Sequence, residues 1–265
     1  MRVCLLTPEP GHPLLAAAAA LLEAAGHRVE SLDPGAVDAA PADLADVYLL
    51  KSKTPQGLDL ARELERRGAP VLNSAAATTL CQDRAEMAEL ALRAGLPFAG
   101  TRTYGSLAAW AAAEPLGGSP LVVKSRHSRR HDLVARVDDG ARLRELADTW
   151  PQEPVVVQEF APNSGWDHKL WAIGDRVFAA LRRSELAPEG SGPTRSLSLA
   201  ELPPGWADLV LRTGEAFSLD VYGVDLIDTG DGSPLIVDVN AFPGIRGQAG
   251  APQALAALAL ARAAG

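Results

Sequence analysis

Residues 220–247, DVYGVDLIDTGDGSPLIVDVNAFPGIRG, decide how this chain is interpreted. Two apolar runs flank a turn rich in Gly, Asp and Ser, which is the pattern of a β-hairpin. Side chains alternate across a strand, so Asp238 and Asn240 share one face and their apolar neighbours share the other. In the register that the turn suggests, Asp225 lies beside Asp238. The hairpin is therefore predicted to gather two carboxylates and one amide oxygen.

Oxygen ligands of this kind suit Mg²⁺, which keeps several waters and takes further ligands from nucleotide phosphates. Mn²⁺ is an alternative ion for the same ligands. The competing interpretation is an exposed strand face that merely carries acids. We prefer the metal site for Asp225, Asp238 and Asn240, because each lies in an apolar run where an unpaired polar group is costly to bury.

Composition and charge limit the class of protein. The 265 residues, 47% hydrophobic and 22% charged, suffice for one large domain or for two to three lobes around a cleft. A net charge of −8 provides no global basic field, so nucleic acid and anionic membrane surfaces are disfavoured as partners. No CxxC spacing, export signal or membrane-length apolar run is visible, which favours a cytoplasmic protein.

The first 72 residues follow the order strand, helix, strand, strand, helix, strand, which predicts a doubly wound α/β lobe. The third strand, DVYLLK, ends at Lys51, and Lys53 follows two residues later. Ligands of open α/β sheets bind beyond the carboxyl ends of the strands, so both lysines are candidate contacts for an anionic substrate. Solvated loop lysines are the competing interpretation.

The hairpin also resembles a known family. VDLI, followed about a dozen residues later by VDVNAFPG, is similar to the metal-binding end of the ATP-grasp superfamily. Further motifs of that superfamily occur in the expected order over roughly residues 45–250. The resemblance implies an α/β fold with an N-terminal lobe at residues 1–80, a small lid at 81–155 and a C-terminal lobe with the metal site at 156–265, the last two enclosing Mg-ATP.

The resemblance implies an ATP site made of five residues. Lys124 ends the strand PLVVK and corresponds to the lysine that reaches the ATP phosphates. Arg84 stands where an Asp-Lys pair usually starts a helix, and arginine does not simply replace lysine. Gln158, Glu159 and Phe160 end the strand VVVQEF and correspond to the hinge that binds the adenine and the ribose.

The resemblance also implies two catalytic residues. Lys169 lies on a strand with Asp167 on the same face, in a spacing that reads Gly-x-Asp-x-Arg in the ligases of the family. Arg182 ends the next strand, where it would stabilise the charge of the phosphoryl group in transit. Neighbours on a strand point apart, so only one of Arg182 and Arg183 is expected to face the cleft, and we favour Arg182. Residues 185–202 are predicted to form a mobile loop nearby.

The loop SRHSRRHD after Lys124 contains no glycine, although the ligases of the family generally carry a glycine-rich loop over the phosphates. Arg129, Arg130 and His131 form a local positive patch suited to an anionic acceptor, and the competing interpretation is a solvated hairpin. Gly244, in the loop after the metal strand, is assigned to substrate binding through the same resemblance.

Two enzyme classes fit these motifs. A kinase would transfer the γ-phosphate to a hydroxyl of a small anionic acceptor, and the basic loop, Lys169 and an Asp at 238 resemble the inositol polyphosphate kinases of the superfamily. A carboxylate–amine ligase would form an acyl phosphate, and Asn73-Ser74 and the Gly165-x-Asp167 spacing resemble the glutamate-ligase-like enzymes. We prefer the kinase and keep the ligase as the alternative.

A third interpretation is an ATP-grasp fold that binds nucleotide without turnover. The missing glycine-rich loop and Arg84 in place of lysine motivate it. The complete set of Asp225, Asp238 and Asn240 argues against it. The sequence does not name the acceptor, and a homodimer, common in related families, is left open.

Overall fold

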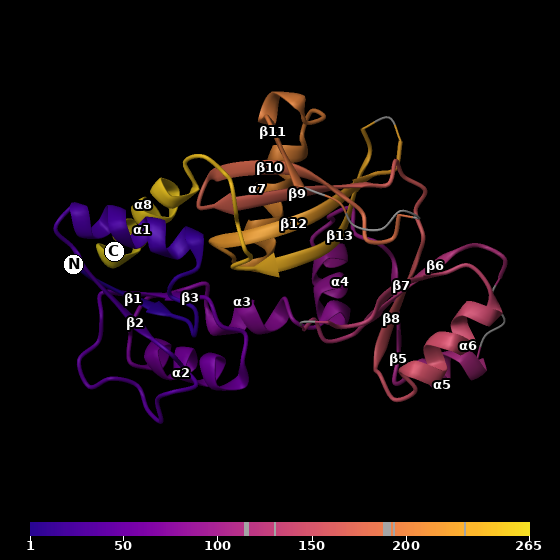
Figure 1. The fold of residues 1–265 in the computed structure, drawn as a ribbon, viewed down its shortest axis with the longest axis horizontal. Coiled ribbons are helices and arrows are strands. Elements are labelled where there is room, and N and C mark those ends of the chain that lie inside the picture. Colours follow the sequence, from indigo (N-terminus) through magenta and orange to yellow (C-terminus); the bar gives the residue numbers. More distant parts are fainter. Residues whose placement is uncertain (114–116, 130, 188–191, 193, 231) are drawn as a thin grey trace.

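The computed structural model describes the chain except residues 114–116, 130, 188–191, 193 and 231. Three β-sheets follow one another along the longest axis of the molecule (Figure 1). The first sheet is parallel, in the order β2-β1-β3-β4. Its strands are β1 (Arg2–Leu6), β2 (Arg28–Leu32), β3 (Val47–Leu50) and β4 (Val71–Leu72).

Helices cover both faces of the first sheet, which is why its central strands β1 and β3 are apolar almost throughout. On one face, Val3 and Leu5 pack against α1 (Pro13–Ala24) and α8 (Ala251–Ala263). On the other, Cys4 and Leu6 pack against α2 (Pro55–Arg66). The predicted doubly wound α/β lobe is confirmed.

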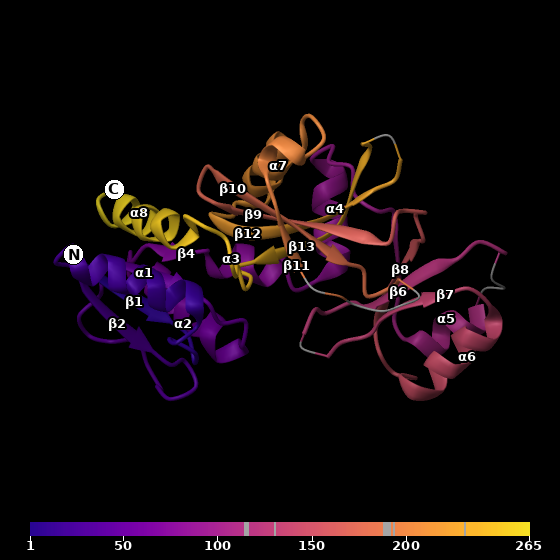
Figure 2. The same cartoon turned by 45° about the horizontal axis from the view of Figure 1, so that its top comes forward.

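The second sheet is antiparallel, in the order β5-β8-β6-β7. It consists of β5 (Thr101–Tyr104), β6 (Leu121–Ser125), β7 (Val134–Val137) and β8 (Val155–Glu159). Two helices, α5 (Leu107–Ala113) and α6 (Gly140–Thr149), contribute to its apolar core, in which Trp110 is completely buried. These helices cover one face of the second sheet, and the opposite face is directed toward the third sheet (Figure 2).

The third sheet is antiparallel, in the order β11-β10-β9-β12-β13. Its strands are β9 (Trp166–Ile173), β10 (Arg176–Arg183), β11 (Thr194–Leu197), β12 (Val221–Asp228) and β13 (Pro234–Ala241). α4 (Arg84–Arg93) and α7 (Trp206–Phe217) share its main core. Among the described residues, no helix has the length and apolarity that crossing a membrane requires.

The segment predicted as a mobile loop, 185–202, contains ordered structure. β11 pairs with β10 from Ala179 to Arg182, and the short 3-10 helix η1 (Leu199–Glu201) follows, capped by Ser198. The polar composition of β11 conceals a strand, because an edge strand is held by its backbone ladder and needs few apolar side chains. Residues 188–191 and 193 of this segment lie outside the described residues.

The helices do not all pack in the lobe to which their place in the sequence assigns them. α4 packs on the third sheet although the sequence assigns it to the lid, and α8 returns to the first lobe. α3 (Ala75–Leu80) connects the first lobe to α4. Asn73 joins the first lobe to β12, since its Nδ2 donates to the Val221 carbonyl at 2.7 Å and its Oδ1 accepts from the Asp220 and Val221 amides.

Candidate functional site

The hairpin β12–β13 has the register that the sequence predicts. Asp225 lies opposite Asp238, and Asn240 lies two residues further along the same face of β13. An irregularity in the pairing follows directly after Asp225. All three side chains line one cavity, so the structure brings the predicted metal ligands together.

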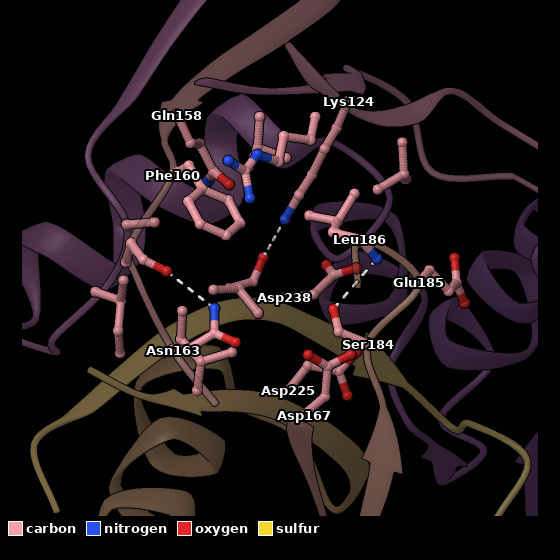
Figure 3. Close-up of a pocket in the computed structure, with 18 of the residues that line it drawn as sticks. Lys124, Gln158, Phe160, Asn163, Asp167, Ser184, Glu185, Leu186, Asp225 and Asp238 are labelled. Atoms are coloured by element: carbon pink, nitrogen blue, oxygen red, sulfur yellow. Dashed lines mark hydrogen bonds between the residues drawn. The ribbon is translucent and has the colours of Figure 1, made fainter. Parts of the chain in front are cut away.

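This cavity, of about 610 Å³, lies between the second and third sheets (Figure 3). Residues of both sheets line it, including every residue that the sequence assigns to ATP, metal and catalysis. Those residues are Arg84, Lys124, Gln158, Glu159, Phe160, Lys169, Arg182, Asp225, Asp238 and Asn240.

Cations compensate the carboxylates of the cavity. Lys169 Nζ lies 2.5 Å from Asp225 Oδ2 and 3.9 Å from Asp167 Oδ2, and Arg84 Nη2 lies 3.6 Å from Asp238 Oδ2. Burial raises the pKa of Asp167, and neighbouring Asp225 adds to the rise while Lys169 opposes it. The carboxylates are thus held in a cation-rich cavity that also suits a metal ion.

The oxygen atoms of Asp225, Asp238 and Asn240 fit the ligand preference of Mg²⁺, as the sequence predicts. Among the described residues there is no group of three His, Cys, Asp or Glu side chains that could hold a metal alone. Asp225, Asp238 and Asn240 supply two carboxylates and an amide oxygen. Such an incomplete oxygen set suits Mg²⁺ that takes its other ligands from phosphates and water.

Lys124 and residues 158–160, which the sequence predicts to contact ATP, all line the main cavity. Lys124, 7% exposed at the end of β6, donates from Nζ to the Val237 carbonyl at 2.8 Å, and burial lowers its pKa. Gln158 is held by a hydrogen bond from Nε2 to Thr101 Oγ1 at 2.9 Å. The Arg136 guanidinium lies 4.1 Å from the centre of the Phe160 ring. These contacts fix the polar and aromatic groups at one end of the cavity (Figure 3).

The few lysines of the chain lie in or near two neighbouring cavities. The chain contains four lysines, Lys51, Lys53, Lys124 and Lys169. Lys124 and Lys169 line the main cavity, Lys51 donates to the backbone that follows β13, and Lys53 lines a second cavity. No lysine is used for general surface solubility in this acidic protein.

Ion pairs fix the described residues of the lid loop, 125–129 and 131–132. Arg126 contacts both oxygens of Asp83 at 2.9–3.0 Å, and Asp132 accepts from Arg84 at 2.6 Å. Arg129 forms a two-bonded pair with Glu153, with both distances 2.7 Å. A loop without glycine is therefore held by side chains.

The structure describes two of the three residues of the predicted positive patch, and their surroundings differ. The charge of Arg129 is matched by Glu153, because the loop folds back on the strand connection before β8. His131 is exposed, with a φ of 60°, and lines none of the described cavities. Arg130 lies outside the described residues.

Both arginines at the end of β10 line the main cavity, so the expectation that only one faces the cleft is wrong. Arg182 lies 3.1 Å from Glu185 and 3.9 Å from Asp167. Arg183 is the last residue of β10, and its guanidinium lies 5.7 Å from the centre of the Trp166 ring. The alternation of side chains between the two faces of the sheet ends where β10 ends, so the long side chain of Arg183 can extend past the end of the strand into the cavity.

The two substrate lysines have different surroundings. Lys51 Nζ donates to the Phe242 and Pro243 carbonyls at 3.0 and 3.3 Å and is not among the residues lining the described cavities. Lys53 lines a second cavity beside the main one. Gly244 is exposed on the same loop, where an added side chain would come within 3.5 Å of His12 Nε2.

The pKa of Lys51 offers a direct check of these contacts. Burial, together with the charge of Lys53, lowers it from 10.5 to about 8. In ¹³C-dimethylated protein, we expect one lysine NMR signal to titrate near pH 8 and to be missing from a Lys51→Arg sample. Because the folded protein binds this proton less tightly than the unfolded chain, the contribution of Lys51 to stability should rise between pH 8 and 10.5. A Lys51 signal that titrates at 10 or above would contradict the burial described here.

Three polar residues in or near the site were not singled out from the sequence. Asp132 holds Arg84, and the signal for it was present, because Asp132 is the only acid of the lid loop. Gln82 and His12 carry buried ring or amide nitrogens without partners among the described residues. Nothing in their sequence surroundings separates them from ordinary loop residues.

Residues 82–253 match the model of the RimK-like ATP-grasp domain. The chain belongs to this family. The match covers the second and third sheets, and it confirms the ATP-grasp fold expected from the sequence.

Three curated relatives indicate which chemistry the family performs. A probable alpha-L-glutamate ligase 2 of Hahella chejuensis is 29% identical over 203 residues, which cover 74% of this chain and 66% of that protein. A second probable alpha-L-glutamate ligase 2, of a Shewanella species, is 26% identical over 278 residues, which cover 95% of this chain and 91% of that protein. A ribosomal protein bS6–L-glutamate ligase of Salmonella paratyphi B is 29% identical and covers 72% and 66%.

Solved structures agree on the fold. A RimK domain ATP-grasp protein of Sphaerobacter thermophilus superposes with a TM-score of 0.78, is 25% identical, and covers 98% of this chain and 100% of its own. D-alanine–D-alanine ligase of Bacillus anthracis in complex with ATP superposes with a TM-score of 0.71, is 17% identical, and covers 100% and 96%. The relatives therefore match the ligase alternative better than the kinase that the sequence motifs led us to prefer.

Proposed function

We propose that this protein is an ATP-dependent carboxylate–amine ligase that joins an acidic amino acid to a carboxylate through an acyl phosphate. The observation that carries the proposal is one cavity, in a chain of the RimK-like family, that holds both paired carboxylates of the hairpin together with Lys124 and Lys169. The names of the relatives, glutamate ligases, support glutamate as the amine. The carboxylate partner is a small molecule or the end of a peptide.

We assign Asp225, Asp238 and Asn240 to Mg²⁺, with Gln158, Glu159 and Phe160 on the nucleotide base and ribose. Bound Mg²⁺ would supply charge neutralisation for the phosphates of ATP. Arg84 lies within reach of Asp238 and is tied to the lid loop through Asp132, so it would position the metal carboxylate against the lid.

The chain's own residues would support two chemical steps. First, a substrate carboxylate oxygen attacks the γ-phosphorus of ATP and ADP leaves, while Lys124, Lys169 and Arg182 neutralise the charge on the transferred group. Second, the amine attacks the acyl carbon, phosphate leaves, and the amine loses a proton to solvent. The two sheets that form the cavity would limit the access of water, which would otherwise hydrolyse the acyl phosphate.

Product analysis by ³¹P NMR tests this proposal. With Mg-ATP, a panel of carboxylates and L-glutamate, we expect ADP and inorganic phosphate only when both organic substrates are present. With hydroxylamine in place of glutamate, a hydroxamate should accumulate, because hydroxylamine traps acyl phosphates. A stable phosphomonoester formed from a polyol phosphate would instead establish the kinase and overturn the ligase.

A further inference from the structure

A second cavity, of about 380 Å³, lies beside the main one and is not needed for the proposed ATP site. It is lined by Lys53, Thr54, Gln82, Ser128 and Arg129. These residues come from the end of β3, the start of α2, the turn before α4 and the lid loop. Ser128 lines both cavities, so the two are neighbours.

The polar side chains that line the second cavity can all donate hydrogen bonds, and none of them is a carboxylate. Gln82 Nε2 is buried without a hydrogen-bond partner in the described part of the chain. The Lys53 ammonium has neither a hydrogen bond nor an ion pair with any residue that the structure describes. Buried donors without acceptors are costly, so a ligand that brings acceptor oxygens is favoured here.

Lys53 supplies the charge of this cavity. The charge of Arg129 is compensated by its hydrogen-bonded pair with Glu153. Asp238 attracts the Lys53 ammonium most strongly among the charged groups, and Arg84 repels it. Burial lowers the pKa of Lys53, which an anion bound beside it would raise again. Thr54 caps α2, so the positive end of that helix adds to the same potential.

We propose that the second cavity binds one carboxylate of a free acidic amino acid, the amine substrate of the ligase. This inference rests on the proposed function. A volume of about 380 Å³ is at the small end of ligand pockets, which suits one amino acid better than a peptide. Because Ser128 lines both cavities, the rest of the molecule would lie close to Asp225 and Asp238, where the acyl phosphate would form.

Steady-state kinetics of Lys53→Met and Gln82→Leu test the proposal. We expect the KM for L-glutamate to rise about tenfold or more in Lys53→Met, because a charge-assisted hydrogen bond is lost, and less in Gln82→Leu. The KM for ATP should change by less than about threefold, since ground-state binding of only one substrate is affected. Wild-type protein should prefer glutamate to glutamine, and Lys53→Met should lose that preference.

Arg66→Met is the matched control, because Arg66 is exposed at the far end of α2 and pairs with Glu63. It should leave both KM values unchanged. A glutamate KM that stays at the wild-type value in Lys53→Met would overturn the second cavity as the amino-acid site while leaving the ligase proposal intact. A rise confined to the KM of the carboxylate partner would overturn it equally.

A binding measurement without turnover separates this inference from the proposed function. In ¹³C-dimethylated protein without ATP, the Lys53 signal, identified by its loss in Lys53→Met, should shift and saturate with L-glutamate and not with L-glutamine. Saturation without ligation of any amino acid would refute the ligase and support the cavity as a carboxylate site. A Lys53 signal that does not respond to glutamate would refute the cavity.

Discussion

Replacing Asp238 with Ala is expected to lower ATP turnover by about 10³-fold or more, since losing a metal ligand removes several kcal/mol of stabilisation of the transition state. Asp238 lies at the centre of the cavity, opposite Asp225, with its side chain 17% exposed. The apolar core of the third sheet is not touched by this change, and Arg84 keeps Asp132 as a partner. The variant should therefore fold, which circular dichroism and thermal unfolding would verify.

Asp175→Ala is the control for this experiment. Asp175 is an exposed acid in the turn between β9 and β10 of the same sheet, outside the cavity. The Asp175→Ala variant should turn over ATP at the wild-type rate. Full activity of Asp238→Ala at limiting Mg²⁺ would remove the metal site that we assign to the hairpin.

Lys169→Met is expected to reduce kcat by about 10²–10³-fold, the usual cost of losing a preorganised group that stabilises charge in the transition state. Lys169 lies between Asp225 and Asp167, and its side chain is only 11% exposed. Without its charge, the two carboxylates repel each other and the transferred phosphoryl group lacks a counter-charge. The loss should appear in kcat more than in the KM for ATP.

Lys169→Arg separates charge from packing in this experiment. A guanidinium supplies the same charge from the same strand face, and the ligases that this chain resembles carry Arg at this spacing, so we expect activity within about tenfold of wild type. Arg176→Met, an exposed cation at the start of β10, should have no effect. Equal activity of Lys169→Met and wild type would exclude a catalytic role for Lys169.

The parts of the site that follow from strand geometry could be predicted from the sequence. The hairpin register places Asp225 beside Asp238, and Lys169 follows Asp167 on one face, because side-chain alternation depends only on the backbone. The orientation of the lid loop was not predictable in the same way. Arg129 turns to Glu153, a residue 24 positions away, and such long-range pairing leaves no local pattern.

The preference for the kinase shows a second limit of sequence patterns. An Asp at 238, Lys169 and the basic loop are each compatible with both chemistries, because both begin with transfer of the γ-phosphoryl group to an oxygen. What separates the two classes is the acceptor. The groups that would bind the substrates come from lobes far apart in sequence: the cavity that we propose for the amine substrate is lined by Lys53 of the first lobe and Ser128 of the lid loop.

The return of α8 to the first lobe determines the order in which that lobe can be completed during synthesis. One face of its sheet, with Val3, Leu5, Val47 and Leu49, is covered by α1 and α8 together. Until the ribosome has released α8, part of this apolar face has no intramolecular cover and is open to aggregation or to chaperones. Residues 1–80 therefore form a lobe in space whose apolar face is fully covered only after α8 has been synthesised.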